Sequence, residues 1–205
     1  MSDKRLIYLI RHGEILIEKQ VRRYIGQSDI LLSQDGICQA QLVQAQLAKQ
    51  ELTAVFCSDL VRSVATAEII AKPLNLAPTS RRDLREISMG NWEGKTFTEI
   101  ERLYPTEYVE RGKDIVNYVI PGGESFATCQ TRILAAFTEL VSTTTGNILI
   151  VGHAGVNRIL LCHILGMPLE NLFHIAQDYS CINIIAAEKN QYHIKLLNGL
   201  ANPGV

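Results

Sequence analysis

The sequence predicts an α/β fold: a three-layer α/β/α sandwich with a mostly parallel central sheet, a C-terminal antiparallel hairpin, and a loop and helix excursion over the functional site. Strand-like and helix-like segments alternate along most of the 205 residues, as in chains whose helices cover a parallel sheet. Residues 6–10 and 148–151 are apolar without interruption, which is typical of strands buried on both faces. With 47% hydrophobic residues, we expect a single domain over residues 1–205.

The first third of the chain divides into alternating strands and helices. We expect a strand over 6–10, a helix over 34–50, a strand over 54–57 and a helix that ends near residue 72. Ser33 is a suitable N-cap for the first helix, and Ser58 or Asp59 for the second. The second helix should stop near Pro73, because proline cannot continue an α-helix.

The middle of the chain, residues 81–125, has a different composition. It is rich in glycine and proline and shows one short helical pattern, over residues 96–103. Frequent glycine and proline residues are typical of loops, and functional loops lie over the sites they serve. We therefore expect an inserted, lid-like segment that lies over a pocket and influences the choice of substrate.

Regular elements return after this segment. Ser125 or Glu124 should cap a helix that runs to about residue 141. A strand over 148–151 is followed by a helix that ends before Gly166. Two strand patterns, 182–187 and 192–197, are separated by a short polar turn and predict the closing antiparallel hairpin.

Composition excludes several kinds of partner. The 20 basic and 21 acidic residues are spread without long runs of one charge, so we expect neither nucleic acid nor a membrane surface as a partner. The five cysteines are widely spaced and form no C-x-x-C pair, which favours reduced thiols and a cytoplasmic protein without a targeting segment. A small molecule is the expected partner, and a homodimer is left open.

Two histidines follow the two continuously apolar strands. The segment Arg11-His12-Gly13-Glu14 ends the first, and Gly152-His153-Ala154-Gly155 ends the other. If these strands are parallel neighbours, both imidazoles lie at one crevice. The chain has no H-E-x-x-H or Cys/His cluster for a metal and no G-x-S-x-G elbow for a base to activate. A nucleophilic histidine beside Arg11 suits phosphoryl transfer, which requires positive charge and positioning.

Other residues can complete such a site. Arg62 lies in the first turns of a helix that follows a strand, where an anion is favoured and a guanidinium can bind two phosphate oxygens. Breaking a phosphoester also requires a proton for the leaving oxygen. Glu86 and Glu93 are both candidates for this proton donor, and the residues themselves do not decide between them.

Four sequence blocks resemble, in the same order, those of the histidine phosphatase superfamily, also called phosphoglycerate mutase-like. They are Arg11-His12-Gly13-Glu14; Leu60, Arg62, Thr66 and Ala67; Leu84-x-Glu86 with Gly90-x-Trp92-Glu93-Gly94; and Gly152-His153-x-Gly155. The resemblance runs over nearly the whole chain. It implies a phosphoric monoester hydrolase that needs no metal ion and no organic cofactor, and a small phosphorylated metabolite as its substrate.

The resemblance also implies a role for each candidate residue. His12 would carry the phosphoryl group in a covalent intermediate. Glu86 would protonate the leaving group and then activate water, which leaves Glu93 with a structural role. The phosphate would be held by Arg11, His12, Arg62, His153 and the backbone N–H of Ala154. Arg23 and Gln27 would be further substrate-binding residues.

The resemblance leaves the substrate open. The chain lacks the long middle insertion of the related mutases, which favours a phosphatase over a phosphoglycerate mutase. Residues 23–29 and 166–179 resemble the α-ribazole phosphatases of cobalamin assembly, whereas Pro121-Gly122-Gly123-Glu124-Ser125 resembles fructose-2,6-bisphosphatase and broad-specificity sugar phosphatases. A non-catalytic sensor of phosphorylated metabolites is a further alternative.

One position departs from the pattern of the family. Glu18 lies near the place where many relatives carry an asparagine that faces the phosphate. A carboxylate there would repel the substrate unless it turns away from the pocket or a neighbouring cation compensates for its charge. The pair Arg22-Arg23 could supply that cation.

Overall fold

A single six-stranded sheet organises the protein, for which a computed structural model describes residues 4–18, 21–189 and 191–201. Its order is β3-β2-β4-β1-β5-β6. The strands are β1 (Arg5–Arg11), β2 (Leu52–Ser58), β3 (Thr79–Arg81), β4 (Asn147–Gly152), β5 (Ile182–Glu188) and β6 (Gln191–Gly199). The first four in spatial order are parallel, and β5 and β6 form the antiparallel end. The predicted fold class is confirmed.

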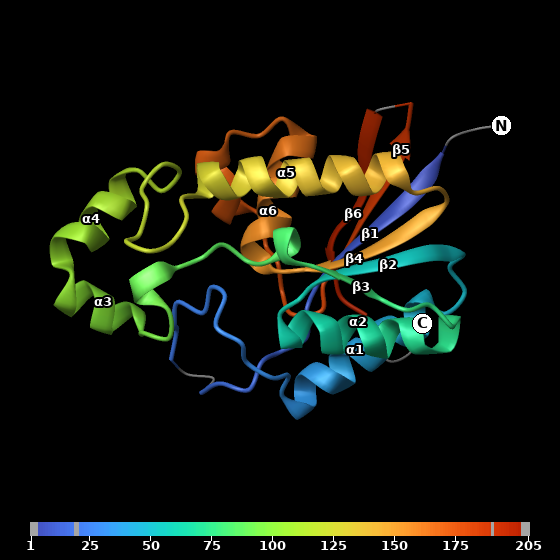
Figure 1. The fold of residues 1–205 in the computed structure, drawn as a ribbon, viewed down its shortest axis with the longest axis horizontal. Helices are drawn as coiled ribbons and strands as arrows, with labels where there is room; N and C mark the ends of the chain where they lie inside the picture. Colours follow the sequence, from blue (N-terminus) through green and yellow to red (C-terminus); the bar gives the residue numbers. More distant parts are fainter. Residues whose placement is uncertain (1–3, 19–20, 190, 202–205) are drawn as a thin grey trace.

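Helices cover both faces of this sheet (Figure 1). On one side lie α1 (Gln34–Leu47) and α2 (Val61–Ala71), and on the other lie α5 (Phe126–Thr143) and α6 (Ala154–Leu165). Strand β1 is buried by both layers, because Tyr8 and Ile10 belong to the core under α1 and α2, whereas Ile7 and Leu9 belong to the core under α5 and α6. This alternation explains why the strand is apolar at every position from Leu6 to Ile10.

The capping predictions were partly wrong. Ser33 does cap α1 by accepting from the backbone N–H of Gly36 at 3.1 Å, although the helix ends at Leu47 rather than residue 50. Ser125 likewise caps α5. Helix α2, however, begins at Val61, and neither Ser58 nor Asp59 caps it. Asp59 instead forms an ion pair with Arg85 at 2.6 Å, and the backbone N–H of Val61 donates to the side chain of Asp29.

The segment 81–125 contains more regular structure than predicted. It holds α3 (Phe97–Leu103), the predicted helix with its Thr96 capping box, and also α4 (Pro105–Lys113), which was not predicted. None of the residues of α4 is fully buried, and Tyr108 and Val109 are its only large apolar side chains, too few for the repeated apolar spacing by which a helix is recognised. Strand β3 is only three residues long and was missed for the same lack of pattern.

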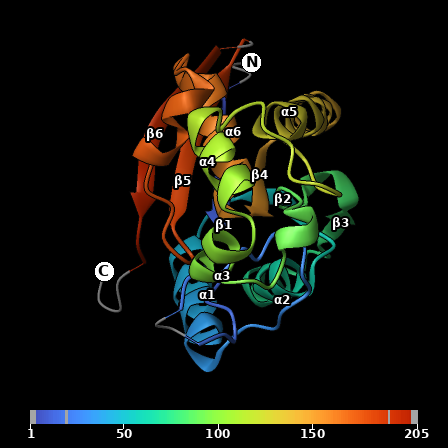
Figure 2. The same cartoon turned by 90° about the vertical axis from the view of Figure 1, so that its left-hand side faces the viewer.

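Helices α3 and α4 lie beyond the carboxyl ends of the parallel strands, in front of the sheet in Figure 2. A small core formed by Tyr24, Trp92, Ile100 and Ile120 holds this region together. The segment 81–125 therefore has its own packing, and it faces the edge of the sheet where the two histidines emerge.

Within the described residues, no helix has both the length and the apolar character needed to cross a bilayer.

Candidate active site

The two histidines meet because their strands are parallel neighbours. Arg11, the last residue of β1, is in register with Gly152, the last residue of β4. His12 and His153 follow directly, and their ring centroids are 5.0 Å apart. The carboxyl edge of a parallel sheet is the usual place for a ligand in α/β folds.

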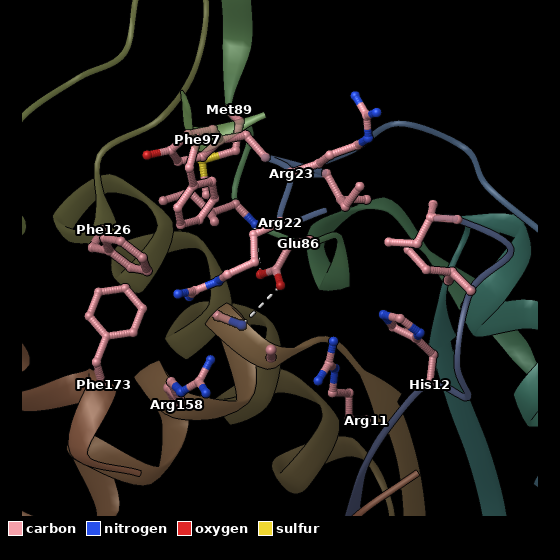
Figure 3. Close-up of a pocket in the computed structure, with 18 of the residues that line it drawn as sticks. Arg11, His12, Arg22, Arg23, Glu86, Met89, Phe97, Phe126, Arg158 and Phe173 are labelled. Atoms are coloured by element: carbon pink, nitrogen blue, oxygen red, sulfur yellow. Dashed lines mark hydrogen bonds between the residues drawn. The ribbon is translucent and has the colours of Figure 1, made fainter. Parts of the chain in front are cut away.

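A cavity of about 690 Å³ opens at this edge. At one end it is lined by Arg11, His12, Arg62, Glu86, Ala154 and Gly155. Its outer half is lined by apolar and aromatic side chains and by further arginines, among them Phe97, Phe126, Phe173, Arg22, Arg111 and Arg158. Figure 3 shows His12, Arg11 and Glu86 around the inner end, and the phenyl rings on the opposite side.

His12 is held as a neutral ring with one nitrogen available. Its Nδ1 lies 2.7 Å from the backbone oxygen of Gly13, and because a carbonyl only accepts, Nδ1 carries the proton and Nε2 keeps its lone pair. The side chain is 4% exposed. Burial, followed by the charges of Arg11 and Arg62, holds the pKa of His12 well below its ordinary value.

His153 lies behind His12, fully buried and outside the cavity lining. Its Nε2 is 2.6 Å from the hydroxyl of Ser58, while its Nδ1 is buried without a hydrogen-bond partner among the described residues. Burial, followed by the charge of Arg62, lowers the pKa of His153 well below its ordinary value. When the Ser58 hydroxyl donates to Nε2, Nδ1 carries the proton and is available to donate.

Two guanidinium groups are fixed beside His12. Arg11 donates to the backbone oxygen of Gln177 at 2.7 Å and lies 3.8 Å from the centroid of the Tyr179 ring. Arg62 is 1% exposed and donates to the backbone oxygens of Ser28 and Gly26 at 2.7 and 2.8 Å. Both line the inner end of the cavity, which makes this end suitable for a phosphate.

The structure separates the two glutamates. Glu86 lines the cavity, where its carboxylate accepts from the N–H groups of Gly155 at 2.9 Å, Val156 at 3.1 Å and Ile87 at 3.0 Å. Such a close approach requires Gly155, because a Cβ there would lie 2.5 Å from Glu86 Oε1. Glu86 is thus the carboxylate that reaches the phosphate end.

Glu93 lies outside the cavity lining and holds the loop that fixes Arg62. Its Oε1 accepts from the N–H groups of Gln27 and Met89, and its Oε2 accepts from the Ser28 hydroxyl. This is the same loop whose carbonyls accept from Arg62.

The remaining predicted binding residues lie in different places. Ala154 lines the inner end, and Arg23 lines the outer part. The Arg23 guanidinium donates to the backbone oxygen of Gly94 and lies 3.9 Å from Glu18, whose side chain is 68% exposed. Glu18 therefore turns away from the phosphate end. The structure does not bring Gln27 to the cavity, because its side-chain amide donates to the backbone oxygen of Glu86.

Sequence reasoning missed several residues that line or support the site. Ser58 was considered only as a helix cap, and Tyr179, Arg111 and Arg158 were not singled out. Arg158 could have been found, because it lies four residues after Ala154 on α6 and so faces the same side. Among the described residues, no cluster of three or more potential metal ligands occurs.

Comparison with known proteins identifies the family. The model of the histidine phosphatase superfamily (branch 1) matches residues 7–199. A Yersinia pestis protein named "Probable phosphoglycerate mutase GpmB" is 38% identical over 167 residues, 79% of this chain and 75% of its own. A Hydrogenobacter thermophilus protein named "Putative phosphoserine phosphatase 2" is 29% identical and covers 97% of both chains. The crystal structure of the α-ribazole phosphatase from Shigella flexneri superimposes with a TM-score of 0.88 at 28% identity, over 95% of this chain and 96% of that one.

Proposed function

This chain belongs to the histidine phosphatase superfamily, and from that premise we propose that it hydrolyses phosphomonoesters through a phosphohistidine on His12. The observation that carries the proposal is the state of His12, a neutral ring beside the Arg11 and Arg62 guanidinium groups. Its Nδ1 proton is engaged by the Gly13 carbonyl, so the lone pair of Nε2 is the available nucleophile.

In the first step Nε2 of His12 attacks phosphorus, so that an N–P bond forms and the bond from phosphorus to the ester oxygen breaks. Glu86, in its protonated form, donates its proton to the departing oxygen. Arg11 and Arg62 bind the phosphoryl oxygens and stabilise the negative charge on them. The Nδ1–H of His153, in the tautomer favoured by a donating Ser58 hydroxyl, would add a further hydrogen bond.

In the second step a water molecule attacks phosphorus from the side vacated by the leaving alcohol. Glu86, now a carboxylate, accepts a proton from this water, the N–P bond breaks, and its electron pair returns to Nε2. Inorganic phosphate leaves with Glu86 protonated again, as the cycle began. These steps use only side chains at the inner end of the cavity, with His153 directly behind it, so we expect full activity in the presence of a chelator such as EDTA.

For the substrate, we propose α-ribazole 5′-phosphate as the first compound to test. Residues 23–29 and 166–179 support it, and so does the likeness to the Shigella flexneri enzyme. The aromatic lining of the outer half suits a flat apolar base. The relatives named for phosphoserine and phosphoglycerate support a second candidate class, small phosphomonoesters that also carry a carboxylate.

The proposed reaction is tested by trapping the intermediate. The protein is incubated with a ³²P-labelled phosphomonoester and quenched, and we expect a protein-bound phosphate that is labile to acid and stable to base. His12→Ala should remove the label, whereas His193→Ala, on the exposed face of β6, should label as the wild type does. Labelling that persists in His12→Ala would contradict the proposal, and so would the absence of turnover on every phosphoester tried.

A further inference from the structure

The cavity contains more positive charge than a single phosphate requires. Among the described residues, six arginines line it, against one carboxylate, Glu86. Two of the six, Arg11 and Arg62, belong to the phosphate end, and Arg23 lies beside Glu18. The remaining three form no ion pair with a described residue: Arg22, Arg111 and Arg158.

Arg111, on α4, is the most isolated of these cations. Its guanidinium lies among aromatic rings, 5.7 Å from the centroid of Tyr24 and 6.0 Å from those of Trp92 and Phe126. It makes no hydrogen bond to any residue that the structure describes. Burial lowers the pKa of Arg111, and the groups that oppose this shift are tyrosines rather than carboxylates. A partly desolvated cation of this kind is stabilised when an anion binds to it.

Arg158, on α6, lines the cavity about one helical turn beyond Ala154, which belongs to the phosphate end. Among the described residues its one hydrogen-bond partner is Ile175, to whose backbone oxygen Nε donates at 2.7 Å. Its guanidinium is 5.7 Å from the Phe173 ring, and Phe173 packs edge-on against Phe126 with centroids 5.8 Å apart. Because Phe126 also contacts Arg111, one pair of rings links the two guanidinium groups.

Arg22 completes the group at the mouth of the cavity. It is exposed and lies 4.8 Å from the centroid of Phe97. Figure 3 shows the side chains of Arg22 and Arg158 directed into the space between Glu86 and the phenyl rings of Phe126 and Phe173.

We propose that Arg111 and Arg158, with Arg22 at the mouth, form a second anion subsite, and that the preferred substrate is a phosphomonoester with a carboxylate or a second phosphate at its far end. This inference rests on the proposed phosphatase function and names its substrate class. Arg158 lies four residues beyond Ala154, a rise of about 6 Å along an α-helix, so the two anionic groups should be separated by a few bonds. Of the two candidates named under the proposed function, the second subsite therefore favours the small doubly anionic esters over α-ribazole 5′-phosphate, which has one anionic group.

The test compares three-carbon phosphomonoesters that differ only at the far end. These are glycerol 3-phosphate with a hydroxyl, 3-phosphoglycerate with a carboxylate, and glycerol 1,3-bisphosphate with a phosphate, and α-ribazole 5′-phosphate is measured beside them. We expect kcat/KM to be at least about tenfold higher for one or both doubly anionic compounds than for glycerol 3-phosphate, equivalent to one charge-assisted contact. The better of the two identifies the anionic group.

Three variants locate the preference. Arg111→Met keeps an apolar stem among the rings and removes the cation, and Arg158→Lys keeps the charge but loses the planar fork. Each should reduce the ratio of kcat/KM between the preferred compound and glycerol 3-phosphate by about tenfold, chiefly through KM. Arg102→Gln, on α3 and outside the cavity lining, is the matched control and should keep the wild-type ratio.

The outcomes separate this inference from the proposed function. Turnover of glycerol 3-phosphate at the same kcat/KM as the doubly anionic compounds would overturn the second subsite while leaving the phosphatase intact. A preference that survives in both Arg111→Met and Arg158→Lys would also overturn it. Absence of turnover on all four compounds and on 4-nitrophenyl phosphate would overturn the proposed function itself.

Discussion

The position of Glu86 can be tested without changing Glu86. The substitution Gly155→Ala adds one methyl group, whose carbon would lie 2.5 Å from Glu86 Oε1. Ordinary contact begins at 3.4 Å, so the carboxylate must retreat by about 0.9 Å, the difference between these two distances. The displaced atom is the end of a flexible side chain, so the fold should tolerate the substitution.

The size of the effect follows from the role proposed for Glu86. Displacing a catalytic group by about 1 Å costs about 100-fold in rate, equivalent to about 2.7 kcal/mol of activation free energy. We expect this loss in kcat/KM for glycerol 3-phosphate, whose alkoxide leaves poorly without a proton. For 4-nitrophenyl phosphate, whose phenolate leaves without help, the loss should stay below about tenfold.

The assay is steady-state kinetics on this pair of substrates, with Gly112→Ala as the matched control. Gly112 also lines the cavity, but a Cβ there meets no atom within 4 Å, so both kcat/KM values should match the wild type. An equal loss of Gly155→Ala activity on both substrates would refute the proton-donor role of Glu86, and an unchanged value for glycerol 3-phosphate would refute its placement. Glu86→Gln is the less clean test, because its amide would present N–H groups to backbone N–H donors.

Three further predictions concern the inner end of the site. Burial and neighbouring charge lower the pKa values of His12 and His153. Below pH ~6.5 the unfolded chain therefore takes up protons that the native state does not. As the pH decreases, the free energy of unfolding should fall by about 1.4 kcal/mol per pH unit for each histidine. Urea unfolding between pH 7.5 and 5.5 should show a slope smaller by this amount in His12→Asn, and an unaltered slope would contradict the buried neutral state. Ser58→Ala removes the 2.6 Å contact to His153. It should lower kcat/KM about tenfold on alkyl and aryl phosphates alike, equivalent to one hydrogen bond of about 1.4 kcal/mol. Full activity would exclude a role for this contact. Glu93→Gln should retain activity. Glu93→Ala should lower activity equally on glycerol 3-phosphate and 4-nitrophenyl phosphate, because it loosens the loop that holds Arg62. A loss in Glu93→Gln that is confined to alkyl phosphates would identify Glu93 as the acid.

Those parts of the fold that bury a continuous apolar pattern could be predicted from the sequence. Strand β1 is apolar from Leu6 to Ile10, between two layers, and the buried residues of α5 recur at helical spacing. Helix α4 has only two large apolar side chains, Tyr108 and Val109, so no repeated apolar spacing distinguishes it from the loops around it. The start of α2 was misplaced because its first N–H group is satisfied by Asp29, which is distant in the sequence.

The candidate site likewise has a part that the sequence predicts and a part that it does not. The inner end could be predicted because its histidines directly follow two apolar strands, and strand pairing brings them together. The outer half depends on α4 and on the packing of Phe126 against Phe173. Arg111 could therefore not be predicted as a binding residue from the sequence, because its place at the cavity depends on α4. For the same reason the sequence defined the substrate preference least well.

The contrast between Glu86 and Glu93 shows why proximity in the sequence could not assign the acid. Both carboxylates accept from backbone N–H groups, and both lie where a glycine leaves space: a Cβ at Gly155 would be 2.5 Å from Glu86, and a Cβ at Gly26 would be 2.5 Å from Glu93. The difference is in where those N–H groups come from. Two of the donors to Glu86 belong to the first turn of α6 and hold its carboxylate in the cavity lining, whereas the donors to Glu93 are Gln27 and Met89, which hold its carboxylate outside that lining. The chemical role of each glutamate therefore depends on its tertiary partner, and substitution of that partner tests the role more directly than substitution of the glutamate.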